Sequence, residues 1–351
     1  METPGVGMLG YAFMGRAHAH ALITLGHMTG PPAIAPRLVA VAGRDEGERT
    51  AFAERFGFER HVADWADVVA DPDVQVLENL LPNHLHAEPT IAAARAGKHV
   101  VCEKPLALDA PQAREMLDAV REAGVVHLCA FNYRFVPAVR RAREMLEAGE
   151  LGEVHHFRGV YRQSWGADPA REGVWRFDPA QAGGGALGDL ASHVVDLARY
   201  LVGDIESVAS QVATFVPGRE VDDAVAAAVS FAGGAIGTIE ATRFATGNLN
   251  RFTWEVNGSK GSVAFDLERL NELTIDGERT LVNPEGWWPP GHVLGWEHTF
   301  VFELRRFLDA VAGRGAVEPH GATFEDGLRA AEVCDAILAS ARDGRHVAPG
   351  A

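Results

Sequence analysis

The stretch that decides the fold is Gly5-Val6-Gly7-Met8-Leu9-Gly10-Tyr11-Ala12-Phe13-Met14-Gly15-Arg16, close to the start of the chain. Its apolar residues predict a buried strand, its glycines a tight turn, and the segment 17–25 a helix. A literal GxGxxG occurs at Gly5, Gly7 and Gly10, but it lies inside the apolar run. We therefore assign the turn to Gly10, Ala12 and Gly15, where backbone N–H groups and a positive helix end would face a phosphate. The alternative is an ordinary strand–turn–helix unit without a ligand.

Composition limits the classes of protein to be considered. The 351 residues predict two domains, which we place at 1–131 and 132–351. The net charge of −16, from 32 basic and 48 acidic residues, argues against nucleic acid or an anionic membrane as a partner. No apolar run is long enough to span a membrane, and residues 1–4 lead directly into the first strand, so we expect no signal peptide. Three scattered cysteines fit neither a zinc site nor a disulfide framework, and we expect a cytoplasmic protein.

The end of the second predicted strand bears on the choice of nucleotide. The strand covers 37–42 and is followed by Gly43-Arg44-Asp45 and a helix over 46–56. In a dinucleotide-binding unit an acid at this strand tip favours NAD, whereas a small residue followed by arginine leaves room for a 2′-phosphate. The sequence therefore favours NADP over NAD. The alternative is that Arg44 is a solvated loop residue and that NAD binds as well.

Strands and helices alternate through the rest of the first part. The predicted strands cover 74–77, 98–102 and 125–130, and the predicted helices cover 89–96 and 110–123. This alternation indicates an α/β domain with a doubly wound parallel sheet, the Rossmann arrangement. Ligands of such sheets lie beyond the carboxyl ends of the strands. We therefore expect one cleft lined by the residues that fall there, which are Tyr11, Arg44, Pro82, Lys104 and Asn132.

After Pro137 strands mostly follow strands. The predicted elements are helices over 138–148, 186–202, 299–312 and 324–342, and strands over 153–165, 208–215, 224–231, 235–244, 252–257 and 262–266. Turn signals at Gly233-Gly234 and Asn257-Gly258 separate some of the strands. This pattern predicts an α+β domain with an open, mainly antiparallel sheet. Its uncovered face is expected to join copies of the chain into a dimer or tetramer.

The helix over 186–202 combines an apolar surface with one polar stripe. Asp189, His193, Asp196 and Tyr200 follow each other at offsets of four, three and four, so they share one helix face. Buried ionisable groups are costly without partners, and we expect this stripe to form the wall of a cleft. The alternative is a hydrogen-bonded core network. Lys104, at the end of a strand and before a proline, could orient a hydroxyl, polarise a carbonyl or form a Schiff base. The alternative is a salt bridge to a neighbouring acid.

Taken together, these motifs resemble the glucose–fructose oxidoreductase / inositol dehydrogenase / rhizopine-catabolism (Gfo/Idh/MocA) family. The matching segments are Phe13-Met14-Gly15 with His18, Pro82-Asn83-His84-Leu85-His86, Glu103-Lys104-Pro105, Asn132-Tyr133-Arg134-Phe135, and the run from Gly183 to His193. The resemblance implies a nucleotide domain followed by an open-sheet domain, and hydride transfer between a nicotinamide cofactor and a carbinol of a sugar or cyclic polyol. It also implies a cis peptide bond between Lys104 and Pro105.

The resemblance assigns roles to individual residues. It implies cofactor contacts from Gly10, Tyr11, Ala12, Phe13, Met14, Gly15, Gly43, Arg44, Pro82, Asn83, His86, Glu103, Lys104 and Asn132. It implies His193 as the general base, Asp189 as the residue that orients substrate or His193, and Lys104 as the cation that stabilises the alkoxide. Further substrate contacts are expected from Tyr133, Gln163, Trp165, Arg176 and His298, with Gln163 and Trp165 on one face of a strand. The chain departs from the family pattern at Ala12, Gly43 and Ser192.

Several readings of the site remain open at this stage. The segments Ser164-Trp165, Asp168-Pro169 and Trp175-Arg176 further resemble family members that act on levoglucosan and related cyclic sugars. One alternative is a glycosidase of the same fold that oxidises and re-reduces its sugar through retained NAD. A second is a non-catalytic regulator that binds the dinucleotide. A third is a metal enzyme built on Asp189 and His193, but we expect no metal, because the other histidine pairs are poorly spaced.

Overall fold

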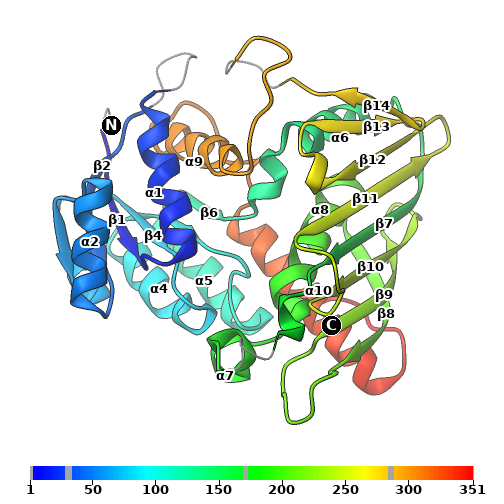
Figure 1. Ribbon diagram of the computed structural model, residues 1–351, viewed down its shortest axis with the longest axis horizontal. Coiled ribbons are helices and arrows are strands. Elements are labelled where there is room, and N and C mark those ends of the chain that lie inside the picture. Colours follow the sequence, from blue (N-terminus) through cyan, green and yellow to red (C-terminus); the bar gives the residue numbers. More distant parts are fainter. Residues whose placement is uncertain (1–2, 28–33, 169–172, 284–287, 351) are drawn as a thin grey trace.

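A parallel sheet of six strands forms the first half of the computed structural model, which describes residues 3–27, 34–168, 173–283 and 288–350 (Figure 1). Its strand order is β3-β2-β1-β4-β5-β6. The strands are β1 (Gly5–Leu9), β2 (Arg37–Ala42), β3 (Arg60–Val62), β4 (Val76–Asn79), β5 (His99–Cys102) and β6 (His127–Cys129). The helices between them are α1 (Phe13–Leu25), α2 (Glu46–Phe56), α3 (Trp65–Ala70), α4 (Ala87–Arg95) and α5 (Ala110–Ala123). The predicted Rossmann arrangement is therefore confirmed.

The glycines of β1 explain why the literal GxGxxG is not the turn. A Cβ atom on Gly5 would lie 1.9 Å from the carbonyl oxygen of Asp73, and one on Gly7 would lie 2.3 Å from the side chain of Val68. Both glycines are therefore required for close packing inside the sheet. The turn follows at Gly10, whose φ of 95° suits a residue without a side chain.

The second half is built on an eight-stranded sheet of order β14-β13-β12-β11-β7-β10-β9-β8. Neighbouring strands are antiparallel except for β7 and β10, which are parallel. The strands are β7 (Val154–Arg162), β8 (Ile205–Ala213), β9 (Ala224–Phe231), β10 (Ile236–Thr242), β11 (Arg251–Gly258), β12 (Ser262–Asp266), β13 (Glu272–Ile275) and β14 (Glu278–Leu281). The open, mainly antiparallel sheet predicted from the sequence is confirmed.

In the described part of the chain, the helices that pack on this second sheet cover one of its faces (Figure 1). They are α6 (Pro137–Glu147), α8 (Ser192–Leu201) and α10 (Phe324–Asp343), and α8 and α10 pack against each other as well as on the strands. The remaining long helix, α9 (His298–Val311), returns to pack on α1 of the first half. Short helical segments complete the chain: η1 (Asn83–Leu85), η2 (Asn132–Phe135), η3 (Trp165–Ala167), η5 (Trp175–Phe177), α7 (Pro179–Ala182), η6 (Leu187–Ala191) and η7 (Leu267–Arg269).

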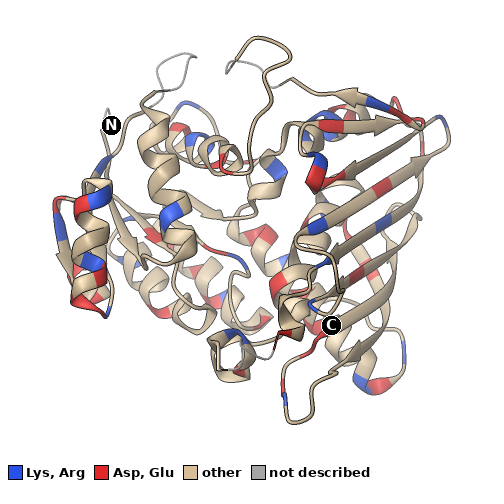
Figure 2. Cartoon of the chain, viewed as in Figure 1, with Lys and Arg blue, Asp and Glu red and all other residues tan. Residues whose placement is uncertain are grey.

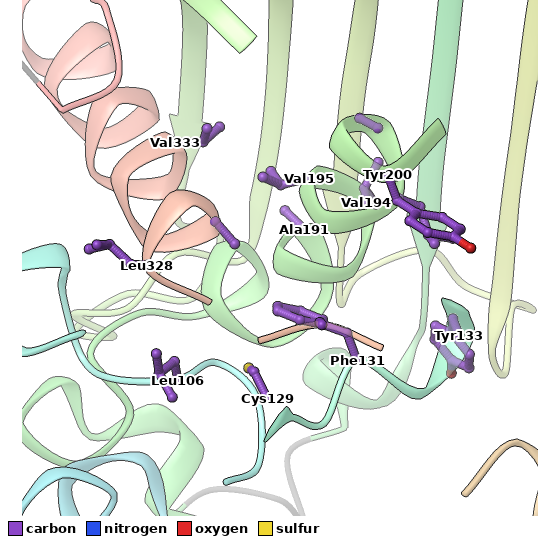
Figure 3. Close-up of a cluster of buried hydrophobic side chains, with 14 of the residues drawn as sticks. Leu106, Cys129, Phe131, Tyr133, Ala191, Val194, Val195, Tyr200, Leu328 and Val333 are labelled. Atoms are coloured by element: carbon purple, nitrogen blue, oxygen red, sulfur yellow. The ribbon is translucent and has the colours of Figure 1, made fainter. Parts of the chain in front are cut away.

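The junction of the two halves is a continuous apolar core. Phe131 and Tyr133, which follow β6, belong to the same buried cluster as Ala191, Val194 and Leu328. Figure 3 shows the Phe131 ring below Ala191 of η6. Because this core fixes α8 against the ends of the parallel strands, it also fixes the position of any polar group on α8. Charged side chains, in contrast, are distributed over both halves (Figure 2). Among the described residues, no helix is both long enough and apolar enough to cross a membrane.

Several predicted boundaries were wrong in informative ways. The expected strand over 153–165 ends at Arg162, and the expected helix over 186–202 begins as the π-helix η6 before it becomes α8. Five short elements among the strands and α-helices, β3, α3, α7, β13 and β14, were not predicted. Each has at most six residues, too few to show a clear hydrophobic period.

Candidate active site

A cavity of about 660 Å³ lies between the carboxyl ends of the first sheet and the helix-covered side of the second. The first half contributes residues of the glycine-rich turn, of the segment after β4 and of the segment after β5. The second half contributes side chains from η2, from β7 and the segment after it, and from η6 and α8. The polar and aromatic side chains among the lining residues are Phe13, Asn83, Glu103, Lys104, Asn132, Tyr133, Tyr161, Gln163, Trp165, Trp175, Arg176, Asp189, His193, Arg243, Asn250, Trp296 and Phe300.

Lys104 crosses from the first half to meet Asp189. Its Nζ donates to the backbone oxygen of Asp189 at 2.8 Å and lies 3.3 Å from Asp189 Oδ1. The predicted cis bond between Lys104 and Pro105 is present. The ammonium and the carboxylate, predicted separately from a strand end and a helix stripe, thus form one ion pair in the cavity.

Local packing determines where η6 places Asp189. The carboxylate of Asp222 accepts the backbone N–H groups of Gly185 at 2.6 Å and Leu187 at 2.7 Å. A Cβ atom on Gly185 would lie 1.7 Å from the backbone oxygen of Asp222, so only glycine allows this approach. The run of glycines before the helix therefore has a structural reason: it lets the helix start dock on Asp222.

Two arginines also contact the Asp189 carboxylate. Arg243 Nη2 lies 3.0 Å from Oδ2, and Arg176 Nε lies 4.0 Å from Oδ1. Burial alone would raise the pKa of Asp189, but Lys104, Arg243 and Arg176 together lower it well below its usual range. Asp189 therefore remains ionised across the physiological range, and its orientation is fixed from several sides.

His193 lies one turn beyond Asp189 and is only 5% exposed. Its ring packs at 4.5 Å from the ring of Tyr133 and at 5.8 Å from that of Phe131. Within the described part of the chain, no hydrogen-bond partner is found for either ring nitrogen. Burial, and then the charge of Lys104, lower the pKa of His193 well below its ordinary value. The result is a neutral imidazole on the cavity wall that can accept a proton from a bound hydroxyl.

A chain of hydrogen bonds lines the cavity next to His193. The Tyr161 hydroxyl lies 3.0 Å from that of Tyr133 and donates to Asn250 Oδ1 at 2.7 Å. Gln163 Nε2 donates to the same oxygen at 2.6 Å, and Trp165 Nε1 donates to Gln163 Oε1 at 2.6 Å. Gln163 and Trp165 do meet, but the predicted reason was wrong, because β7 has already ended and Trp165 begins the helix η3.

Five polar or aromatic cavity residues were not identified from the sequence: Tyr161, Arg243, Asn250, Trp296 and Phe300. Arg243 is the most closely engaged, since it is 1% exposed and its guanidinium lies 4.7 Å over the Trp165 ring. It directly follows the apolar strand β10, as Lys104 follows β5, so the same signal could have found it. Asn250 lies in a loop whose composition carries no comparable signal.

The turn before α1 fits a dinucleotide phosphate. A Cβ atom on Gly15 would lie 2.5 Å from the backbone oxygen of Gly10, which explains the last glycine of the motif. Helix α1 has no side-chain cap at Ala12 and no acid in its first turn. Its first N–H groups and its positive end are thus available to an anion. Ala12, Phe13 and Met14 also line the cavity.

The cavity covers only part of the single cleft that the sequence predicts. Neither Tyr11 nor Arg44 lines the cavity; both lie near the end of β2, where a Cβ atom on Gly43 would meet the Tyr11 ring at 1.8 Å. The Tyr11 hydroxyl accepts the backbone N–H of Asp45 at 3.1 Å. This second region corresponds to the adenosine end predicted for a dinucleotide, and the cavity to its reactive end.

Other predicted contacts lie outside the cavity as well. His86 is fully buried and bonds backbone oxygens of Leu81 at 2.8 Å and Pro105 at 3.0 Å, so it supports the cavity edge from behind. His298 is absent from the lining, and its Nδ1 accepts the N–H of Gly295 at 3.2 Å. Pro82, Asn83, Glu103 and Asn132 do line the cavity. Pro169 of the predicted Asp168-Pro169 motif lies outside the described residues.

The polar stripe on α8 divides into two environments. Asp189 and His193 face the cavity, whereas Asp196 accepts from Arg134 Nε at 2.9 Å in a buried pair away from it. Tyr200 lies under the guanidinium of Arg134 at 4.8 Å. The prediction of a cleft wall was therefore correct for the first half of the stripe and wrong for the second. Among the described residues, no group of His, Cys, Asp and Glu side chains could hold a metal ion.

Comparison with known proteins agrees with this geometry. Residues 5–131 match the family described as "Oxidoreductase family, NAD-binding Rossmann fold", and residues 139–264 match the "GFO/IDH/MocA C-terminal domain". The chain belongs to the Gfo/Idh/MocA family of oxidoreductases. A levoglucosan dehydrogenase from Pseudarthrobacter phenanthrenivorans is 40% identical over 97% of this chain and 97% of its own length. An inositol 2-dehydrogenase from Rhizobium meliloti is 29% identical over 98% and 99%.

Solved structures of the Gfo/Idh/MocA family show the same overall arrangement. A levoglucosan dehydrogenase in complex with NADH and levoglucosan has a TM-score of 0.96 to this chain at 40% identity, covering 99% of this chain and 100% of the other. GenD2 from gentamicin A biosynthesis, in complex with NAD, has a TM-score of 0.83 at 30% identity, covering 100% and 97%. The chain is thus an NAD-binding Gfo/Idh/MocA oxidoreductase, in a family that contains sugar and polyol dehydrogenases.

Proposed function

We propose that this protein oxidises a carbinol of a cyclic sugar, with an anhydrosugar of the levoglucosan type as the preferred substrate. The observation that carries the proposal is the convergence of Lys104, Asp189 and His193 in one cavity with the residues of the dinucleotide turn. Aromatic walls suit the apolar faces of a sugar ring, and Trp165 and Trp175 both line the cavity. The 40% identical levoglucosan dehydrogenase supports the choice of substrate class.

In this proposal the chain's own residues manage the proton and the developing charge. His193, held neutral, accepts the proton of the substrate hydroxyl. Lys104 donates to the same oxygen as negative charge develops there, and Asp189 keeps the ammonium in position. When bound, the nicotinamide ring supplies the acceptor for the hydride. Ala12, Phe13, Met14, Glu103 and Asn132 are the residues we propose to hold that ring and its ribose.

A substrate screen tests this proposal. Purified protein is incubated with NAD or NADP and with levoglucosan, inositols, aldoses or glycosides, and reduced nicotinamide is followed by absorbance. We expect the highest kcat/KM with levoglucosan or a related anhydrosugar. Release of free sugar from a glycoside without net reduction of the cofactor would favour the redox glycosidase instead. Cofactor binding without turnover of any compound would favour a regulator.

We also propose that NADP is accepted and favoured over NAD. The tip of β2 presents Gly43 where NAD-selective proteins place an acid, and Arg44 is exposed next to it. The nearest carboxylate, that of Asp45, already accepts the N–H of Glu48 at 2.8 Å as the cap of α2. Arg44→Ser is expected to lower kcat/KM for NADP by about 10-fold or more, because one hydrogen bond to the charged 2′-phosphate is lost. The kcat/KM for NAD should be nearly unchanged. Arg55→Ser, in the helix α2 that follows Arg44, is the control. Equal losses with both cofactors would contradict the prediction.

We propose further that the uncovered face of the second sheet joins copies of the chain. On that face Glu255 of β11 lies opposite Arg158 of β7 on one side and opposite Ala264 of β12 on the other. A basic, an acidic and a small residue therefore follow each other across the strands. Such a surface can complement itself about a two-fold axis. Ala264→Arg is expected to reduce the molar mass measured by light scattering to that of a smaller species. Leu338→Arg, on the exposed side of α10, should leave the mass unchanged; a monomeric parent protein would refute the proposal.

A further inference from the structure

A cluster of buried ionisable side chains lies behind the cavity and reaches it through Glu103. Its other members, His18 and Glu78, have no part in the mechanism above. His18 of α1 is fully buried, with Nδ1 3.1 Å from Glu78 Oε2 and Nε2 3.2 Å from Glu103 Oε1. Glu78 belongs to β4, where its neighbours in the sheet are Met8 and Val101, so it lies in the middle of an apolar sheet. The three side chains join α1, β4 and the end of β5 at a single point.

The geometry determines the protonation of His18. Both ring nitrogens face carboxyl oxygens. With both glutamates ionised each carboxylate can only accept, so both nitrogens carry hydrogen and the ring is an imidazolium. Burial opposes that charge, but the hydrogen bonds and charges of Glu103 and Glu78 outweigh it and raise the pKa of His18 to about 10. The cation thus compensates two carboxylates that could not otherwise both stay ionised in such a site.

Glu103 connects this cluster to the reactive side of the cavity. One of its oxygens accepts from His18, and the other, Oε2, accepts the backbone N–H of Lys104 at 3.0 Å. The backbone N–H of Glu103 itself donates to the Asn79 oxygen at 2.9 Å. The segment that carries Lys104 is therefore fastened to α1 through His18 and to β4 through Asn79. The Lys104 side chain extends from this segment into the cavity, where its Nζ donates to the backbone oxygen of Asp189.

We infer that His18 is a positioning residue for the proposed reaction: held as a cation between Glu78 and Glu103, it fixes the 103–104 segment and thereby the Lys104 ammonium against Asp189. This inference rests on the proposed function only for its effect on turnover. Its structural part, that His18 controls the surroundings of the Lys104 ammonium, stands independently of the substrate.

A third acid, Glu303 of α9, provides a matched control. It is fully buried near the cluster, and neither of its carboxyl oxygens has a hydrogen-bond partner among the described residues. Burial raises its pKa well above the ordinary value, and the neighbouring acids Glu103, Glu78 and Asp196 add to the rise, while His18 opposes it. Glu303 is thus a neutral acid. Glutamine has the same shape and is also neutral, so Glu303→Gln should change neither the charge of the cluster nor the position of Lys104.

The experiment compares His18→Gln with Glu303→Gln in the full chain. The chain has only three lysines, Lys98, Lys104 and Lys260, so reductive methylation with isotope-labelled formaldehyde gives a simple NMR spectrum in which Lys104→Arg identifies the Lys104 signal. In His18→Gln we expect that signal to shift, and kcat to fall by about 10²-fold, as for a misplacement of the order of one ångström. Binding of NADH, measured by fluorescence, should still be detected. A new ionisation should enter the pH profile of kcat, because Glu78 and Glu103 can no longer both remain charged.

The two readouts separate failure of the inference from failure of the proposed function. If His18→Gln folds, binds NADH and keeps the parental Lys104 signal, the inference is wrong whatever the turnover. If Glu303→Gln shifts the Lys104 signal as much as His18→Gln does, the effect reflects general damage to the buried cluster, and the inference is equally wrong. The NMR arm needs no substrate, so it remains decisive even if the screen reveals no activity.

Discussion

Replacing Lys104 with methionine is expected to lower kcat by about 10²- to 10³-fold, the usual cost of removing one donor to a developing oxyanion. Methionine keeps the unbranched shape of the side chain and removes only the charge and the donors. Asp189 should stay ionised and in place, because Arg243 still contacts its other oxygen at 3.0 Å. The loss therefore isolates the contribution of the ammonium. Steady-state kinetics with the best substrate of the screen measure it.

The same variant makes a second, directional prediction about pH. Lys104 is one of the causes that lower the pKa of His193, after burial. Without this cation the imidazolium is less disfavoured, so the pKa of His193 rises and the acid limb of the kcat profile moves to higher pH. Lys260→Met, in an exposed turn between β11 and β12, is the control and should match the parent protein in both respects. An unchanged kcat in Lys104→Met would remove this residue from the mechanism.

The architecture could be predicted because its signals are local. Strands β1 and β2 consist largely of apolar residues and are followed by Gly10 and Gly43, and helix α5 has an apolar face that contains Met116, Leu117 and Val120. Elements that are stabilised mainly by contacts with other segments of the chain were not predicted. β14 has four exposed residues and exists because it pairs with β13, and η6 is a π-helix because its first turn docks on Asp222. Such contacts join residues that are far apart in the chain, so the hydrophobic periodicity of the sequence does not indicate them.

The site residues that could be predicted are ionisable residues that lie within or directly after an apolar stretch of sequence. Lys104 at the end of β5 and the Asp189–His193 spacing on a buried helix were recognisable for that reason. Arg243 had the same kind of signal but was overlooked, whereas Tyr161 and Asn250 reach the cavity only through the register of β7 and β11. The opposite error also occurred. Asp196 shares the helix face of His193 in the sequence, yet Arg134 provides it with a buried partner outside the cavity.

The largest effect is expected from His193. Its replacement by alanine should lower kcat by about 10²- to 10⁴-fold, the usual contribution of a general acid–base residue, and leave cofactor affinity at the parental level. The ring packs on Tyr133 and Phe131, so alanine leaves a space of imidazole shape beside the reacting hydroxyl. Added imidazole should therefore restore part of the lost turnover. Because the pKa of His193 is lowered by burial and by Lys104, the parental acid limb should lie below the ordinary histidine range.

A structural role for the ring must be distinguished from a role in proton transfer. His193→Phe retains a planar ring against Tyr133 but has no nitrogen, so it should lose as much turnover as the alanine variant and gain nothing from imidazole. If the phenylalanine variant kept parental kcat, packing rather than proton transfer would explain the position. If the alanine variant kept parental kcat, the base would have to be sought elsewhere. Asp189, ionised among three cations, would then be the remaining acceptor within reach of the Lys104 ammonium.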